Sequence, residues 1–281
     1  MEPIIAIIYD CDGTLAKDTT YFLLDQYGID SEKFWVEVAG EVEKGWDPPL
    51  AYLEGILKLV REGVIADLTA YKLRDIGAAV EMFPGLPEMF AELDQVLANQ
   101  PQLKAAGIKL KHYLVSGGIG DLLRGLKVAP HMTEVFGCEF DFDPESGKAV
   151  TVKSSVSFTE KTKFIYAINK GITGERLRAN PYSVNDVVPP EDRRIPFRNM
   201  IYVGDGPSDI PCFSMIIANG GDGIGVTEKI AKGYELAKGK RTTTGPYSPD
   251  YRPGSDMRRT LEAAILDKAY GVYLELQRAT K

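Results

Sequence analysis

Two acidic residues follow the first apolar run of the chain at a spacing that could support metal-assisted chemistry. Asp10 and Asp12 come directly after residues 4–9, of which four are isoleucine. Such a run is typical of a strand buried on both faces of a parallel sheet. Open α/β sheets place their ligand sites at the carboxyl ends of strands. The pattern therefore favours a Mg²⁺ site containing a nucleophile over a purely structural turn.

Polar side chains also follow two later predicted strands. Ser116 comes after the strand predicted over residues 110–115, and Asp205 and Asp209 come after the strand predicted over residues 199–203. The carboxyl ends of parallel strands lie along one edge of a sheet, so these groups are expected to converge with the first acidic pair.

A cation for the same site is expected at the start of a helix predicted over residues 158–170. Two residues there are candidates, Lys161 and Lys163. Either ammonium group could neutralise charge on an anionic substrate held beside the acids.

Four motifs in this order resemble those of the haloacid dehalogenase (HAD) superfamily. They are Asp-Cys-Asp-Gly-Thr-Leu at residues 10–15, Val-Ser-Gly at 115–117, a lysine that begins a helix, and Gly-Asp-Gly-Pro-Ser-Asp at 204–209. The resemblance covers residues 4 to about 230 and implies a Rossmann-type α/β core with a parallel sheet. It also implies that Asp10 is a nucleophile that becomes phosphorylated and that Asp12 is a general acid and base. Haloacid dehalogenases proper lack this second acid, so Asp12 indicates a phosphotransfer member.

The resemblance extends to the groups around these two acids. Among similar members of the phosphoserine-phosphatase-like branch, the lysine precedes apolar residues three, four and seven positions later, which favours Lys161 over Lys163. The implied Mg²⁺ ligands are Asp10, Asp12 through its backbone carbonyl, Asp205 and, directly or through water, Asp209. The residues implied to hold a phosphate group are Thr14 through its hydroxyl or backbone, Ser116, Gly117 and Lys161.

A helical cap is predicted over residues 17–81, inserted into an α/β core formed by residues 1–16 and 82–281. Its helices are expected to begin near Asp18, Ser31 and Asp47 and to end with one over residues 66–80. One crossover between strands rarely needs so many residues. This place of insertion also resembles the phosphoserine-phosphatase type. The aromatic residues expected in the cap core are Trp35, Trp46, Tyr52 and Tyr71.

Composition narrows the classes of partner. The net charge of −7 and the pI near 5.1 give no basic footprint for nucleic acid. No apolar stretch approaches the roughly 20 residues that span a bilayer, and no secretory signal is evident. Three cysteines without paired spacing favour a reducing, cytoplasmic location. The sequence does not indicate an oligomeric state.

The resulting hypothesis is Mg²⁺-dependent hydrolysis of a small phosphorylated metabolite through phospho-Asp10. A phosphonatase or a phosphotransferase on the same fold is an alternative, and a phosphonatase would need a cap lysine such as Lys33, Lys44, Lys58 or Lys72. A non-catalytic phosphate sensor is a third possibility, but all four motif acids are present. The polar residues 174–198 are expected to form a long surface excursion, and residues 242–254 a loop, neither with an assigned role.

Overall fold

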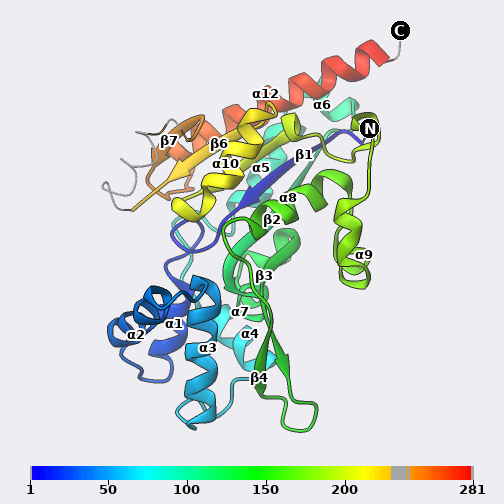
Figure 1. Cartoon of the computed structure of the whole chain (residues 1–281). Helices are drawn as coiled ribbons and strands as arrows, with labels where there is room; N and C mark the ends of the chain where they lie inside the picture. The colour runs from blue at the N-terminus through cyan, green and yellow to red at the C-terminus, as the bar shows by residue number, and fades with distance from the viewer. Residues whose placement is uncertain (1, 229–238, 240, 280–281) are drawn as a thin grey trace.

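A mostly parallel sheet of seven strands runs through the part of the chain that the structure, a computed structural model, describes: residues 2–228, 239 and 241–279 (Figure 1). Its strands are β1 (Ile4–Tyr9), β2 (Lys109–Ile119), β3 (Met132–Phe142), β4 (Ala149–Ser154), β5 (Met200–Gly204), β6 (Asp222–Val226) and β7 (Thr244–Tyr247). In the order β4-β3-β2-β1-β5-β6-β7, every neighbouring pair is parallel except β3 and β4. Since β1 lies between β2 and β5, the polar residues that follow these strands meet at one edge.

Helices cover both faces of the sheet. The described helices after residue 81 are α5 (Met89–Ala98) and α6 (Pro101–Ala105), which precede β2, and α7 (Gly120–Gly125), α8 (Glu160–Lys170), α9 (Gly174–Ala179), α10 (Ile210–Ala218) and α12 (Asp256–Ala279), which follow it. Ile5 and Ile7 of β1 pack with residues of α5 and α12, whereas Ile4 and Ile8 pack with residues of α8 and α10. This alternation buries β1 on both faces, as the sequence predicts. Within the described residues, no helix combines the length and apolarity needed to cross a membrane.

Four helices lie between β1 and α5 in the sequence. They are α1 (Thr19–Asp25), α2 (Ser31–Glu43), α3 (Pro48–Arg61) and α4 (Ala70–Ala79). A side chain accepts a hydrogen bond from a first-turn backbone N–H at the start of each one: Asp18, Asp30, Asp47 and Thr69. Figure 1 shows α1, α2 and α3 gathered at one end of the molecule, with α12 at the opposite end.

The last of these helices, α4, packs closely on α7. A Cβ at Gly77 would lie 2.1 Å from the carbonyl oxygen of Leu122, and a Cβ at Gly125 would lie 2.1 Å from that of Arg74. The Arg74 guanidinium also donates hydrogen bonds to Asp121 on α7. Two glycines and one ion pair thus join α4 to α7, and a larger side chain at either glycine would separate the helices.

Several sequence-based boundaries need correction. The helix expected from residue 66 begins at Ala70, because Thr69 pairs with Lys148 of the β3–β4 connection and keeps the preceding residues extended. The strand expected to end at residue 115 continues to Ile119, with an irregular register against β3. The segment 242–254 contains β7 instead of being loop throughout.

Side-chain burial corrects two further expectations. Trp46 and Tyr71 were expected in the core of the inserted helices, but they are 45% and 80% exposed. Residues 174–198 do not form a surface excursion alone, since they contain α9 and the 3₁₀ turns η2 (Pro181–Asn185), η3 (Pro190–Asp192) and η4 (Phe197–Asn199). Ile195 and Phe197 are buried in the cluster that contains α8 and α10.

Candidate active site

Asp10 is the first residue after the central strand, and its carboxylate is held by two donors. Its backbone N–H donates to the carbonyl oxygen of Val203 on β5 at 2.9 Å, which continues the sheet ladder to this residue. Its Oδ1 accepts a hydrogen bond from the Cys11 N–H at 2.8 Å and lies 3.0 Å from the Lys161 Nζ. Oδ2 has no protein partner within the described part of the chain, so it is the oxygen left for a cation or an electrophile.

The structure places Lys161 in this site and Lys163 outside it. Lys161 is 2% exposed and its Nζ lies 2.8 Å from Asp209 Oδ1 as well as beside Asp10. Burial alone would lower the pKa of Lys161, but the carboxylates of Asp10 and Asp209 raise it above its ordinary value. Lys163, two residues later on α8, pairs with Glu160 at the surface. Lys161 is therefore the cation that could meet a ligand at Asp10.

Asp209 is a fully hydrogen-bonded carboxylate. Its Oδ1 accepts from Lys161 and from the Tyr202 hydroxyl at 2.7 Å, and its Oδ2 accepts from the backbone N–H groups of Asp205 and Gly206 at 3.1 and 3.2 Å. Asp209 has no exposed surface. Four donors on two oxygens indicate that this residue orients the Asp205 loop and the lysine.

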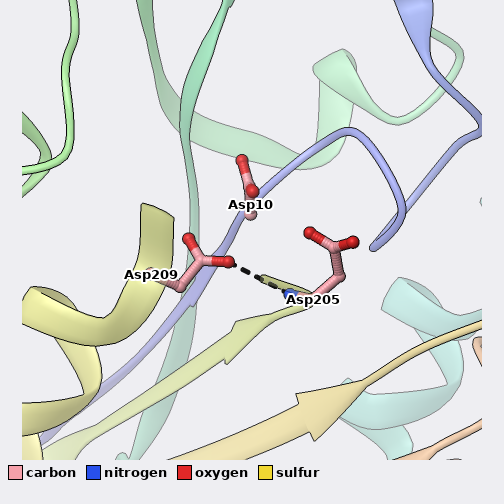
Figure 2. Close-up of side chains that lie close together, drawn as sticks. All are labelled: Asp10, Asp205 and Asp209. Carbon is pink, nitrogen blue, oxygen red and sulfur yellow. Dashed lines mark hydrogen bonds between the residues drawn. The ribbon is translucent and has the colours of Figure 1, made fainter. Parts of the chain in front are cut away.

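Three carboxylates come together where β1 and β5 end. One oxygen from each of Asp10, Asp205 and Asp209 lies within 4.8 Å of the others (Figure 2). Gly13 packs against the carboxylate of Asp205 in this cluster. Its φ is +75°, and a Cβ there would lie 2.4 Å from Asp205 Oδ2. Burial, then the charge of Asp209, raise the pKa of Asp10 to about 7 against the opposing effect of Lys161. Excess negative charge and oxygen donors are what a hard divalent cation requires.

Asp12 has an environment that favours its protonated form. Its Oδ1 accepts a hydrogen bond from the Thr19 N–H at 2.8 Å at the start of α1. Burial and the nearby charge of Asp18 raise the pKa of Asp12 well above its ordinary value. A carboxyl group held neutral near pH 7 can donate a proton to a leaving group.

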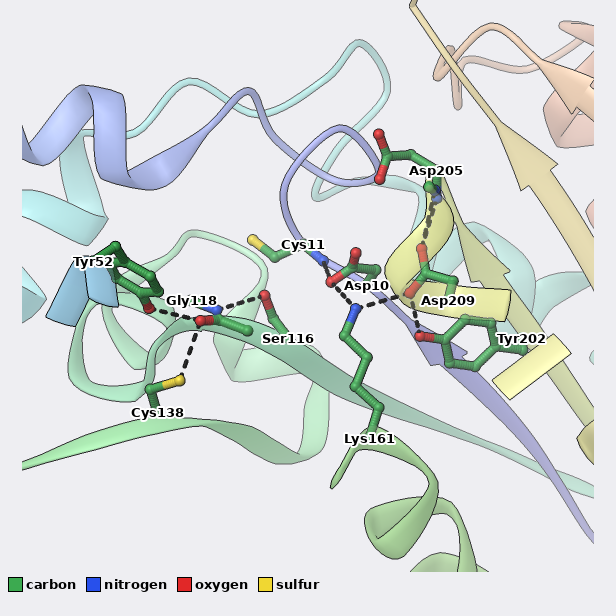
Figure 3. A network of polar contacts seen from close by, with 12 residues as sticks. Asp10, Cys11, Tyr52, Ser116, Gly118, Cys138, Lys161, Tyr202, Asp205 and Asp209 are labelled. Carbon is green, nitrogen blue, oxygen red and sulfur yellow. Dashed lines mark hydrogen bonds and ion pairs between the residues drawn. The ribbon is translucent and has the colours of Figure 1, made fainter. Parts of the chain in front are cut away.

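Ser116 and Gly117 lie across from the acids on β2. The Ser116 side chain is buried, and its Oγ accepts a hydrogen bond from the Gly118 N–H at 3.1 Å. The carbonyl oxygen of Gly117 accepts from the Tyr52 hydroxyl at 2.6 Å and from Cys138 Sγ at 3.2 Å (Figure 3). Tyr52 belongs to α3, so this helix directly contacts the part of β2 that carries Ser116 and Gly117.

Thr14 does not join the other predicted site residues. Its side chain has no exposed surface, its hydroxyl has no hydrogen-bond partner in the described structure, and it does not line the adjacent cavity. Its carbonyl oxygen accepts a hydrogen bond from the buried Tyr251 hydroxyl at 2.7 Å. The phosphate contact expected from Thr14 through its hydroxyl or backbone stays a prediction, and the buried hydroxyl has no protein partner within the described residues.

A cavity of about 630 Å³ opens over these groups. Its core side includes Asp10, Asp12, Ser116, Gly117, Lys161 and Asp205. Its opposite side includes Tyr21 of α1, Glu32 of α2 and Pro49 of α3. Residues of α1, α2 and α3 thus line this cavity together with the acidic edge of the sheet, and such a space suits a small molecule.

Three tyrosines that support this site were not identified from the sequence. Tyr202 holds Asp209, Tyr52 holds Gly117, and Tyr251 holds Thr14. The Tyr52 and Tyr251 hydroxyls act on residues 65 and 237 positions away in the sequence, whereas Tyr202 lies seven positions before Asp209. The position of Tyr202 on a predicted buried strand was the single available signal, since a buried phenol needs a polar partner.

Without divalent cations, Asp10→Asn is expected to raise the melting temperature, and the gain should increase as the pH rises from 4 to 7. The folded-state pKa of about 7 exceeds the ordinary 3.8, so ionisation of Asp10 destabilises the fold progressively over this interval. Thermal melts in EDTA at several pH values would measure the difference. A gain that is equal at pH 4 and pH 8, or a loss at pH 8, would contradict this assignment.

Comparisons with known proteins add an independent view. No protein-family model matches the chain. Over 236 residues the chain is 32% identical to an uncharacterized protein of Borreliella burgdorferi, covering 76% of this chain and 79% of that protein. This identity and coverage place the two proteins in one family.

Solved structures show the same fold. A substrate-bound phosphoserine phosphatase has a TM-score of 0.51 at 15% identity, covering 92% of this chain and 97% of that one. A probable phosphoserine phosphatase from Vibrio cholerae has a TM-score of 0.52 at 17% identity, covering 97% and 67%. A HAD-family hydrolase from Salmonella enterica serovar Typhi has a TM-score of 0.50 at 16% identity; the match covers 82% of this chain and 64% of that longer chain. The Rossmann-type α/β fold expected from the sequence is confirmed.

Proposed function

We propose that this protein is a Mg²⁺-dependent phosphatase of small phosphorylated metabolites. It belongs to one family with the Borreliella burgdorferi protein and has the fold of HAD hydrolases. The observation that carries the proposal is the buried contact between Asp10 and Lys161 on the floor of the cavity, with Asp12 two residues away. This arrangement combines a nucleophile, a cation for the phosphoryl oxygens and a proton donor.

In the first displacement, an Asp10 carboxylate oxygen attacks phosphorus and forms an acyl phosphate. The bond between phosphorus and the ester oxygen breaks, and Asp12 gives its proton to the departing alkoxide. The raised pKa of Asp12 keeps that proton available near neutral pH. Lys161 and the Ser116 hydroxyl hold phosphoryl oxygens during the transfer, because both line the cavity beside Asp10.

In the second displacement, the same residues reverse their roles. The Asp12 carboxylate accepts a proton from water as the water oxygen attacks phosphorus. The bond from phosphorus to Asp10 breaks, which returns the Asp10 carboxylate and releases inorganic phosphate. One acid that first donates and then accepts a proton serves both steps.

The donor set fits Mg²⁺. The carboxylates of Asp10 and Asp205 and the Asp12 carbonyl would hold the ion, and Asp209 would act on it through water or by orienting Asp205, since its oxygens already take four hydrogen bonds. Bound Mg²⁺ would neutralise charge on the phosphoryl group in the transition state.

Asp205→Asn is expected to raise the Mg²⁺ concentration for half-maximal activity by about 10- to 100-fold, through loss of a charged ligand. The asparagine keeps the size of the side chain beside Gly13, so the fold should persist. A Mg²⁺ titration of initial rates measures the effect, with the exposed Asp192→Asn as the matched control. An unchanged half-saturating concentration would remove Asp205 from the ligand set.

We propose that residues 17–81 act as a cap that closes over the substrate and excludes bulk water. Tyr21, Glu32 and Pro49 of this segment line the cavity and would contact the alcohol part of the ester. The volume of about 630 Å³ supports a metabolite of modest size.

The phosphonatase alternative finds less support. It needs a desolvated cap lysine near the substrate. Lys33, Lys44, Lys58 and Lys72 do not line this cavity, and Lys17, which does line it, is exposed. A phosphotransferase would use the same first displacement and differ only in the acceptor that replaces water.

Release of inorganic phosphate from p-nitrophenyl phosphate and a panel of phosphorylated metabolites tests the proposal. We expect release with Mg²⁺ and none with EDTA, and the best substrate of the panel would identify the alcohol. Release that persists in EDTA would contradict the metal dependence. No release of inorganic phosphate from any ester by folded wild-type protein would contradict phosphatase activity. If no phosphorylated acceptor forms when alcohols are supplied, phosphotransferase activity would be contradicted as well.

A further inference from the structure

We propose that Tyr52 is a positioning residue that prepares Ser116 to bind a phosphate oxygen, acting through the peptide between Gly117 and Gly118. The inference rests on the proposed function, in which Ser116 holds phosphate. It assigns a role in the phosphate site to a helix of the cap, and that role lies outside the sequence motifs.

The contacts form a continuous chain from the cap to the cavity. Tyr52 on α3 is 6% exposed, and its hydroxyl donates to the Gly117 carbonyl oxygen at 2.6 Å. The next N–H, that of Gly118, donates to Ser116 Oγ at 3.1 Å. Figure 3 shows Tyr52 on one side of this peptide and Ser116 on the other, with Asp10 and Lys161 beyond it.

The planarity of the peptide explains how one contact controls the other. In a trans peptide, the C=O of Gly117 and the N–H of Gly118 lie in one plane and point in opposite directions. Two consecutive glycines leave this plane free to rotate unless it is held, because neither residue has a Cβ. The Tyr52 hydroxyl holds the carbonyl end, and the N–H end is thereby directed at Ser116.

The orientation of Ser116 Oγ then follows. Its lone pair that faces Gly118 is occupied by a hydrogen bond, so the hydroxyl proton is directed elsewhere. Ser116 lines the cavity together with Asp10 and Lys161. The hydroxyl is thus presented as a donor to a ligand oxygen, before any ligand arrives.

The same contact links cap position to the phosphate site. Pro49 of α3 lines the cavity three residues before Tyr52. The helix that lines the cavity therefore also contacts the part of β2 that carries Ser116. Cys138 Sγ donates to the same carbonyl from β3 at 3.2 Å, but a thiol is a weak donor and belongs to the core. Tyr52 is the donor through which α3 acts.

Tyr52→Phe tests the proposal because it removes the hydroxyl and keeps the ring. We expect the Kd for inorganic phosphate, measured by calorimetry with Mg²⁺ present, to rise about 10-fold, as for the loss of one hydrogen bond that orients a binding group. Tyr27→Phe is the matched control, since that cap tyrosine also loses a hydrogen bond, to Asp67 at 2.7 Å, away from the cavity. Its Kd should not change.

A double-mutant cycle separates positioning from a general structural effect. If Tyr52 acts through Ser116, then Tyr52→Phe should change the phosphate Kd little in a Ser116→Ala background. An equal change in both backgrounds, or none in the wild-type background, would overturn the proposal. Because Kd is measured without turnover, a wild type that binds phosphate but hydrolyses no ester would overturn the proposed function alone. A wild type that does not bind phosphate would overturn both.

Discussion

Asp10→Asn is expected to lower kcat for phosphomonoester hydrolysis by at least about 10⁴-fold, because an amide cannot form the acyl phosphate through which both displacements pass. The substitution keeps the shape of the side chain and the Cys11 N–H can still donate to its oxygen, which lies 2.8 Å away in the native site. Steady-state kinetics with the best ester of the panel would measure the loss.

The interpretation of this result depends on a folded variant. Asp10 carries a raised pKa in its buried site, so its replacement should not lower thermal stability in the absence of metal. Asp75→Asn, an exposed change of the same kind on α4, should retain wild-type kcat. If Asp10→Asn kept more than a tenth of the wild-type kcat, another group would have to be the nucleophile.

Lys161→Met is expected to have the largest effect on stability, lowering the free energy of unfolding by about 3–5 kcal/mol near neutral pH. Methionine fills a similar volume, but it leaves the carboxylates of Asp10 and Asp209 buried without their cation. Chemical denaturation in EDTA measures the loss, since Mg²⁺ would partly replace the missing charge. The rate of phosphomonoester hydrolysis should fall as well.

The matched control is Lys163→Met on the same helix. Lys163 pairs with Glu160 at the surface, where an ion pair contributes at most about 1 kcal/mol. The folded-state pKa of Lys161 is raised, so its contribution is complete at neutral pH and would be lost only as the pH rises through that value. Equal destabilisation by the two substitutions would contradict the buried pairing.

The pH dependence of the Lys161→Met effect gives a second check. Without the lysine, the pKa of Asp10 should rise further, because Lys161 is the group that lowers it. Protonation then removes the unpaired charge at low pH, so the loss of stability should be smaller at pH 5 than at pH 8. A loss that grows as the pH falls would indicate that methionine disrupts packing instead.

The positions of the site residues that come directly after strands could be predicted from the sequence. Asp10 follows a run of residues buried on both faces, and Asp205 follows β5, so parallel pairing with β1 brings the two together. The choice of Lys161 over Lys163 also agrees with the geometry, because the apolar residues that follow it turn its side of α8 toward the core. At these positions the local sequence pattern and the order of strands in the sheet lead to the same placement.

Other features depend on packing between distant segments, and no local pattern specifies them. Thr14 is buried and its carbonyl oxygen accepts a hydrogen bond from Tyr251, a contact across 237 positions of sequence. The start of α4 is displaced by a pairing between Thr69 and Lys148. Secondary-structure propensity depends only on the local sequence. Contacts between distant segments can therefore override it.

The most direct test of the central claim is the identity of the phosphorylated residue. Wild-type protein turning over an ester with Mg²⁺ would be quenched in acid, reduced with borohydride and analysed by peptide mass spectrometry. Reduction converts an aspartyl phosphate to homoserine, and the account predicts homoserine at position 10 in the wild type and none in Asp10→Asn. Homoserine at a different acid, or a turning-over enzyme in which Asp10 stays unmodified at every quench time, would contradict it.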